Sequence, residues 1–117
     1  MRIVIADDAR ALRAILRRSV EKAGHEVVGE ADDDASVVAA VRTLRPDAVI
    51  VDGRLPPRGG AATIERLRAG APSLAIYVVA ALHETGVVRA ATAAGASGAI
   101  LRPVLLTQLT VALDRAP

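Results

Sequence analysis

The sequence has no cysteine and only one aromatic residue, Tyr77, among its 117 positions. Without cysteine there is no disulfide framework, iron–sulfur cluster, thiol catalysis or cysteine zinc site. No apolar run approaches the roughly 20 residues that cross a bilayer. The N-terminus becomes acidic at Asp7 and Asp8, too early for a signal peptide. We therefore expect a cytoplasmic protein with no membrane partner.

Basic charge is not concentrated anywhere in the chain. The 15 Lys and Arg residues face 13 Asp and Glu residues, for a formal net charge of +2. Residues 1–58 hold ten bases and ten acids, and residues 59–117 hold five and three. No basic stripe alternates with aromatic residues, so the sequence does not support direct nucleic-acid binding. The arginines are expected on solvated helix faces.

Large side chains are also scarce, and small apolar ones replace them. Alanine fills 25 positions, and 52% of the residues are hydrophobic. The core must therefore be built from Ala, Val, Ile and Leu, which implies that the secondary-structure elements approach closely. The length predicts a single domain, residues 1–117, with no output domain in the chain.

Short apolar runs recur at intervals of roughly 20 to 28 residues. Their Val and Ile content and nearly continuous apolarity predict strands buried on both faces, as in a parallel sheet. The five runs are Ile3–Ala6, Val27–Ala31, Ala48–Val51, Ile76–Ala80 and Ala99–Leu101.

Segments with helical spacing separate these runs. The first carries Leu12, Ile15, Leu16, Val20 and Ala23 before Gly24, and the second opens at Asp32-Asp33-Asp34 and ends before Pro46. Three more are expected from about Gly60 to Ala69, Glu84 to Ala94 and Val104 to Asp114. Strands that alternate with helices form right-handed βαβ units. The sequence therefore predicts a doubly wound α/β domain with a five-stranded parallel sheet.

Three aspartates follow strands at the edge where such a sheet forms its sites. Asp7 and Asp8 directly follow the first predicted strand, and Asp52 ends the third. Converging carboxylates repel one another unless a cation joins them, and oxygen ligands without Cys or clustered His favour Mg²⁺. Each also has a simpler interpretation, because Asp8 can cap the first helix and Asp52 can be a turn residue before Gly53.

The order and spacing of several short motifs resemble one known family. The chain has neither a P-loop nor a G-x-G-x-x-G loop after the first strand. Instead it carries Asp7-Asp8, Asp52, Leu55-Pro56, Gly60, Gly95-Ala96-Ser97-Gly98 and Arg102-Pro103. Over essentially its whole length it resembles the receiver domain of bacterial two-component response regulators. The resemblance implies a flavodoxin-like fold with strand order 2-1-3-4-5, and a histidine kinase or phosphotransfer protein as partner.

The resemblance also implies a role for each matching residue. Asp52 corresponds to the aspartate that accepts the phosphoryl group. Asp8 corresponds to the direct Mg²⁺ ligand, and Asp7 to its water-mediated companion. The backbone carbonyl of Arg54 corresponds to the remaining protein ligand of Mg²⁺, and Arg102 stands where receivers have the lysine that contacts phosphate.

Three positions depart from the receiver pattern. Ala80 replaces a Thr or Ser, so no hydroxyl is available to bond a phosphoryl oxygen, a bond worth about 1.5–3 kcal/mol. Ala99 replaces the aromatic residue that changes rotamer on activation. Arg102 keeps the positive charge of the usual lysine, but its planar fork is not equivalent to an ammonium. We therefore expect a receiver with degenerate switch residues.

Two alternatives remain open on the sequence alone. The substitutions at Ala80 and Ala99 favour a phosphorylation-independent interaction module, with a homodimer through the fourth and fifth helices as one form. A Mg²⁺-dependent phosphohydrolase is disfavoured, since such enzymes commonly place a second Asp where this chain has Arg54. The chain is thus expected not to be an enzyme, beyond its own phosphotransfer and dephosphorylation.

Overall fold

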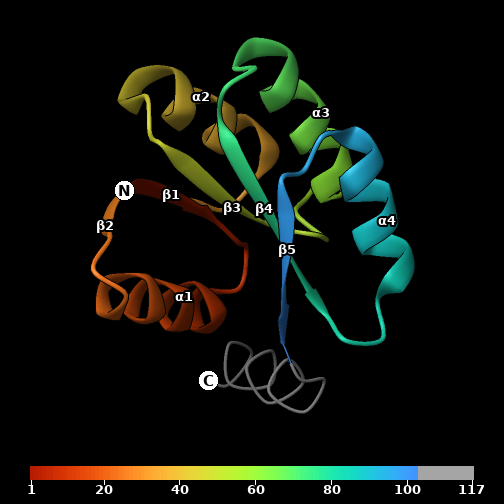
Figure 1. Cartoon of the computed structure of the whole chain (residues 1–117), viewed down its shortest axis with the longest axis horizontal. Coiled ribbons are helices and arrows are strands. Elements are labelled where there is room, and N and C mark those ends of the chain that lie inside the picture. The colour runs from red at the N-terminus through yellow and green to blue at the C-terminus, as the bar shows by residue number, and fades with distance from the viewer. Residues whose placement is uncertain (103–117) are drawn as a thin grey trace.

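The computed structural model describes residues 1–102 (Figure 1). Nine elements alternate regularly within that range. The strands are β1 (Arg2–Ala6), β2 (Glu26–Ala31), β3 (Ala48–Asp52), β4 (Ala75–Ala81) and β5 (Gly98–Arg102). The helices are α1 (Arg10–Lys22), α2 (Asp34–Leu44), α3 (Gly60–Gly70) and α4 (Thr85–Ala94). The fifth predicted helix, from Val104 to Asp114, lies outside the described residues.

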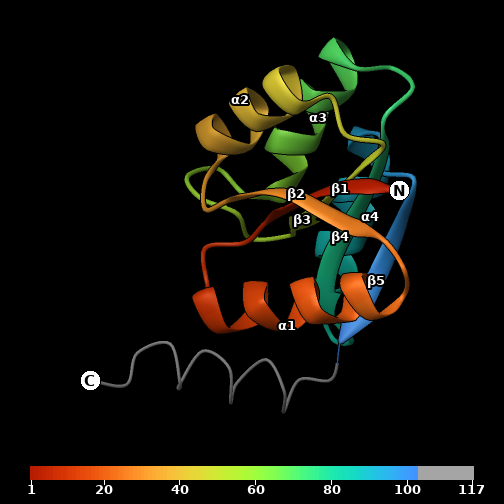
Figure 2. The same ribbon diagram turned by 90° about the vertical axis from the view of Figure 1, so that its left-hand side faces the viewer.

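The five strands form one parallel sheet in the order β2-β1-β3-β4-β5. The predicted fold class and strand order are therefore confirmed. Helices α2, α3 and α4 lie on one face of the sheet and α1 lies on the other (Figure 2). Strands β1 and β3 are neighbours, and the helices that follow them, α1 and α3, cover opposite faces of the sheet. The strand order therefore reverses between β1 and β3. The carboxyl ends of β1 and β3 therefore meet beside the topological switch point, where α/β sheets bind ligands.

Two apolar clusters hold the layers together, one on each face of the sheet. Alternate residues of each strand point to opposite faces, so Val49 and Val51 belong to the cluster under α2, α3 and α4. Ala48 and Ile50 belong to the smaller cluster on the α1 side, where the half-buried Tyr77 also packs. The prediction of a core built from Ala, Val, Ile and Leu is confirmed.

The edge strands correct one sequence-based expectation. All five residues of β3 are buried, as predicted for strands covered on both faces. Ala99, Ile100 and Leu101 of β5 are exposed, and β2 is only partly buried. Each of these two strands has a neighbour on one side only, so apolarity alone overstated their burial. Within the described residues no helix is long and apolar enough to cross a membrane.

Candidate functional site

The three predicted aspartates meet at the carboxyl edge of the sheet. One carboxylate oxygen from each of Asp7, Asp8 and Asp52 lies within 4.8 Å of the others. Asp7 and Asp52 are buried, whereas Asp8 is exposed and leaves the group open to solvent. We call these three residues the acidic cluster. It offers both buried anionic charge and a path for a small ion.

Burial and mutual repulsion make ionisation of Asp7 costly. Desolvation, and then the neighbouring charges of Asp52 and Asp8, raise the pKa of Asp7 to about 7, although the backbone N–H of Ala9 and the Arg102 guanidinium oppose the rise. One carboxylate oxygen accepts that Ala9 N–H at 2.9 Å. The other oxygen, Oδ2, is buried and has no hydrogen-bond partner among the described residues. An orphaned carboxylate oxygen beside two further carboxylates fits a hard divalent cation such as Mg²⁺.

Asp52 is placed by the close approach of α3 to the end of β3. A Cβ on Gly60 would lie 2.4 Å from the backbone oxygen of Asp52, so only glycine permits this packing. The Gly60 N–H donates to the Gly53 carbonyl at 2.9 Å and fixes the turn after β3. The predicted role of Gly60 at the start of the third helix is thus confirmed, with Gly59 as the preceding residue at φ +94°.

Arg102 faces the predicted phosphoacceptor from the end of β5. Its Nη2 lies 3.8 Å from Oδ1 of Asp52, and both side chains are largely buried. Desolvation raises the pKa of Asp52, while the Arg102 guanidinium and the backbone N–H of Arg54 partly counter that rise. The structure therefore brings Arg102 into the site, as its alignment with the family's lysine suggested. The cation is already directed at the carboxylate before any phosphoryl group is added.

The side chain of Arg54 does not enter the acidic cluster. It is 72% exposed and forms an ion pair with Glu84 at the start of α4. The other carboxylate oxygen of Glu84 accepts the backbone N–H of Ala81 at 2.8 Å. The Arg54–Glu84 pair therefore bridges the loop after β3 and the loop after β4, at the rim of the site. No sequence pattern predicts the pair, although Glu84 is the first residue of the fourth predicted helix.

Ala80 and Ala99, which the sequence comparison with receivers predicts to be degenerate switch positions, lie on β4 and β5. Ala80 is buried near the end of β4 and pairs in register with Leu101. Ala99 is exposed on β5, opposite Val78. Asp8 is not the N-cap of α1: that position is Ala9, which makes no side-chain capping hydrogen bond. That simpler interpretation of Asp8 is wrong, and Asp8 remains available to a ligand.

The sequence pattern does not reveal a third buried carboxylate, beside Asp7 and Asp52. Asp34 of α2 accepts the Thr63 hydroxyl at 2.6 Å and pairs with Arg66, and both partners lie on α3. Its backbone N–H donates to the carbonyl of Pro56 at 2.9 Å. The run Asp32-Asp33-Asp34 was interpreted only as a helix start, and Asp33 does make that cap with Ser36. Nothing in the spacing distinguished the capping aspartate from its buried neighbour.

Comparison with known proteins gives a consistent result. The response regulator receiver domain family matches residues 3–114. The chemotaxis protein CheY of Thermotoga maritima is 32% identical over 114 residues, which cover 97% of this chain and 95% of that protein. The transcriptional regulatory protein PdtaR of Mycobacterium tuberculosis is 30% identical, over 98% of this chain and 56% of its own length. The signal receiver domain of the putative response regulator NarL from the same species superposes with a TM-score of 0.79 at 29% identity, over 96% of this chain and 91% of that one.

Proposed function

This chain belongs to the response regulator receiver domain family of two-component signalling, and we propose that Asp52 is its phosphoacceptor. The observation that carries the proposal is the acidic cluster, in which Asp52 lies with Asp7 and Asp8 while Arg102 faces it at 3.8 Å. Receiver domains interact with histidine kinases or phosphotransfer proteins, so one of these is the proposed donor.

The transfer itself needs a carboxylate nucleophile and positive charge around the phosphoryl oxygens. An oxygen of Asp52 attacks phosphorus in line, the bond from phosphorus to the donor atom breaks, and the donor leaves with that electron pair. The product is an acyl phosphate on Asp52. The Arg102 guanidinium, 3.8 Å from Asp52, would hold a phosphoryl oxygen.

The donor set fits Mg²⁺, which would be held by Asp8, Asp52, the backbone carbonyl of Arg54 and, through water, Asp7. The orphaned Oδ2 of Asp7 is the feature of this structure that supports such a site. When bound, the ion neutralises charge on the transferred phosphoryl group. Without a cation, burial first and then the charges of Asp52 and Asp8 disfavour the ionised form of Asp7 and raise its pKa.

We further propose that phosphorylation of this chain does not operate the usual switch. Ala80 has no hydroxyl to attract a phosphoryl oxygen, and Ala99 has no ring to change rotamer. The loop after β4 is instead held by Glu84, which bonds the Ala81 N–H and pairs with Arg54. Phosphate would therefore be bound without the two side chains that commonly relay its presence.

Phosphoacceptance is tested with a small phosphodonor and Mg²⁺. The wild type should gain one phosphate by intact-protein mass spectrometry, and Asp52→Asn should gain none. Asp47→Asn is a matched control on an aspartate remote from the acidic cluster, and it should be labelled like the wild type. An unlabelled wild type, under conditions that label a competent receiver, would show that Asp52 is not a phosphoacceptor.

A second function is favoured by the same two alanines. A phosphorylation-independent receiver could act as an interaction or dimerisation module through the fourth and fifth helices. On α4, Ala91 is fully buried in the core and is not available for such an interface, whereas Val88 is half-buried. If Asp52→Asn leaves self-association and partner binding unchanged while labelling is lost, the interaction function is independent of the site.

A further inference from the structure

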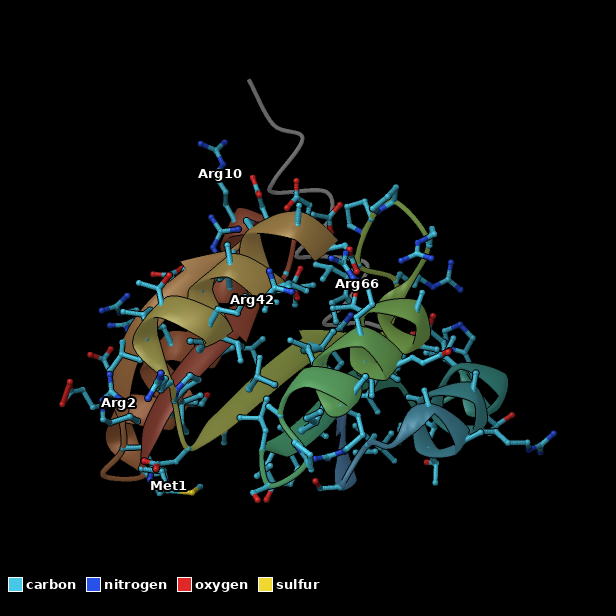
Figure 3. All side chains as sticks on the ribbon, turned by 90° about the horizontal axis from the view of Figure 1, so that it is seen from above. Met1, Arg2, Arg10, Arg42 and Arg66 are labelled. Carbon is cyan, nitrogen blue, oxygen red and sulfur yellow. The ribbon has the colours of Figure 1, made fainter. Side chains whose placement is uncertain are left out.

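A groove between α2 and α3 lies at the opposite end of the sheet from Asp52. It has a volume of about 660 Å³ and is lined by the last turns of both helices and the segments that lead into β3 and β4. Figure 3 labels Arg42 on α2 and Arg66 on α3, the helices that flank it. We call this cavity the α2–α3 groove. It contains no residue of the acidic cluster, so the proposed phosphoacceptor chemistry does not explain it.

The floor of the α2–α3 groove is apolar and already well covered. Val38, Val41, Leu67 and Leu74 line it, and each is less than a tenth exposed. The exposed surface belongs mainly to the rim, where Arg42, Arg45 and Arg66 stand with the rigid Pro72. A ligand here therefore meets guanidinium groups and their aliphatic stems more than a deep apolar cavity. Such a surface suits a polar, salt-sensitive interface.

The positive charge on the rim is only partly neutralised within the described residues. Arg66 pairs with the buried Asp34. Asp47 is the one acidic residue that lines the groove, and its carboxylate accepts the backbone N–H of Arg2 at 2.7 Å. The side chains of Arg42 and Arg45 make no ion pair or hydrogen bond with any described residue. Two guanidiniums thus remain available on one side of the groove.

The backbone at Arg45 supplies an independent reason to regard this rim as functional. Arg45 is the C-cap of α2 and adopts φ +48° and ψ +60°, the left-handed conformation in which glycine is usual. It is the one non-glycine residue with positive φ among those described. Arg45 is therefore held in a strained backbone conformation that a glycine would adopt without strain. What the arginine adds there is a guanidinium on the groove rim.

We propose that the α2–α3 groove is a docking site for an acidic, amphipathic helical segment of a partner protein. Carboxylates of the segment would face Arg42 and Arg45, and its small apolar side chains would lie against the aliphatic stems of these arginines and the exposed Pro72. The site lies at the amino ends of β3 and β4, whereas Asp52 ends β3. Binding is therefore independent of phosphorylation, which separates this proposal from the function proposed for Asp52.

The test uses a fluorescently labelled helical peptide of about 15 residues, with glutamates on one face and leucine and alanine on the other. A matched peptide carries glutamine in place of each glutamate. The full chain should bind the glutamate peptide at least about fivefold more tightly than the glutamine peptide. The difference should shrink at high salt because the rim charges are exposed. Backbone NMR shifts should concentrate on residues 41–47 and 66–74.

The most informative variant is Arg45→Gly, because it should stabilise the fold while it weakens peptide binding. Relief of the left-handed strain should raise the melting temperature by roughly 3 °C, while loss of the guanidinium should weaken peptide binding by about threefold or more. Arg42→Gln should weaken binding without raising the melting temperature. Arg89→Gln, an exposed arginine on α4, is the matched control and should change neither.

Several results would overturn the proposal. Equal affinity for the glutamate and glutamine peptides would do so, and so would unchanged binding in the Arg42→Gln and Arg45→Gly variants. Dissociation constants above about 1 mM for both peptides would also exclude it. Self-association of the chain that both variants abolish, without peptide binding, would assign the groove to a second copy instead. Loss of binding in Asp52→Asn would contradict the independence of the two sites.

Discussion

Two buried carboxylates, those of Asp34 and Asp7, have opposite surroundings. Asp34 is buried between α2 and α3, and both of its oxygens have partners, the Thr63 hydroxyl at 2.6 Å and the Arg66 guanidinium. Asp7 is buried at the sheet edge, has one oxygen without a partner, and faces two more carboxylates. Burial is similar in the two places. What differs is whether the chain itself supplies the compensating groups.

This difference separates a structural carboxylate from a functional one. A buried charge costs free energy unless it is paired and hydrogen-bonded. At Asp34 the chain meets that need internally, and the ion pair ties α2 to α3. At Asp7 the chain provides no partner for one carboxylate oxygen. A bound cation would supply the missing positive charge. The acidic cluster is therefore unstable in isolation and suited to a ligand, as active sites commonly are.

The largest effect is expected when the satisfied carboxylate is removed. Asp34→Ala should lower the free energy of unfolding by about 3 kcal/mol, because two hydrogen bonds to a charged group are lost and the buried Thr63 hydroxyl is left without its acceptor. Denaturant unfolding measures the change. Labelling of Asp52 in the protein that remains folded should persist. A loss below about 0.5 kcal/mol would place Asp34 with ordinary surface charges.

The opposite sign is expected at the unsatisfied carboxylate. The folded state raises the pKa of Asp7 from 3.8 to about 7, so it binds the proton more tightly than the unfolded state does. Stability in the absence of Mg²⁺ should therefore fall as pH rises from about 4 to about 7. Asp7→Asn cannot ionise, and it should be more stable than the wild type at pH 8 by about 2 kcal/mol.

Thermal unfolding across this pH range gives the measurement. Asp34→Asn is the matched control, because it changes a buried carboxylate that is not part of the acidic cluster. Its profile should keep the full decline in stability between pH 4 and 7, whereas Asp7→Asn should reduce that decline to the part that the raised pKa of Asp52 contributes. If Asp7→Asn declines like the wild type, then repulsion in the acidic cluster does not govern the pH dependence.

The sequence predicts the fold, but it does not predict the contrast between Asp34 and Asp7. Alternating apolar runs predicted all five strands and the four described helices, because burial in a parallel sheet is encoded locally. Strands followed by Asp7, Asp8 and Asp52 likewise placed the acidic cluster. Asp34 could not be distinguished from Asp33, since its partners lie on α3 and no local pattern records a contact across some 30 residues.

The effect of Mg²⁺ is expected to be smaller than either substitution. At about ten times its dissociation constant, a ligand of the folded state adds about 1.4 kcal/mol to stability. Wild type and Asp34→Asn should both show this gain at pH 8, where Asp7 is ionised. Asp7→Asn should show little or none. Calorimetric titration with Mg²⁺ measures the same difference directly, and equal binding by Asp7→Asn would remove Asp7 from the site.

The smallest effect is expected at Glu84, a carboxylate between the two extremes. Its side chain is 7% exposed, and it accepts the Ala81 N–H at 2.8 Å, yet its charged partner Arg54 is 72% exposed. Burial raises the pKa of Glu84, but the Ala81 N–H and Arg54 together outweigh that effect and leave it lowered. Solvent screens the ion pair, so Arg54→Ala should cost less than about 0.5 kcal/mol.

A double-mutant cycle with Arg54→Ala and Glu84→Gln isolates this pair, since glutamine retains an acceptor for the Ala81 N–H. The coupling energy should be below about 0.5 kcal/mol and should vanish at high salt. The corresponding cycle for Asp34 and Arg66 should give a larger coupling that salt reduces less, because one partner is buried and also held by Thr63. Similar coupling energies in the two cycles would mean that exposure of the cation does not set the strength of these pairs. The contrast among the three carboxylates would then rest on the number of hydrogen bonds that each accepts.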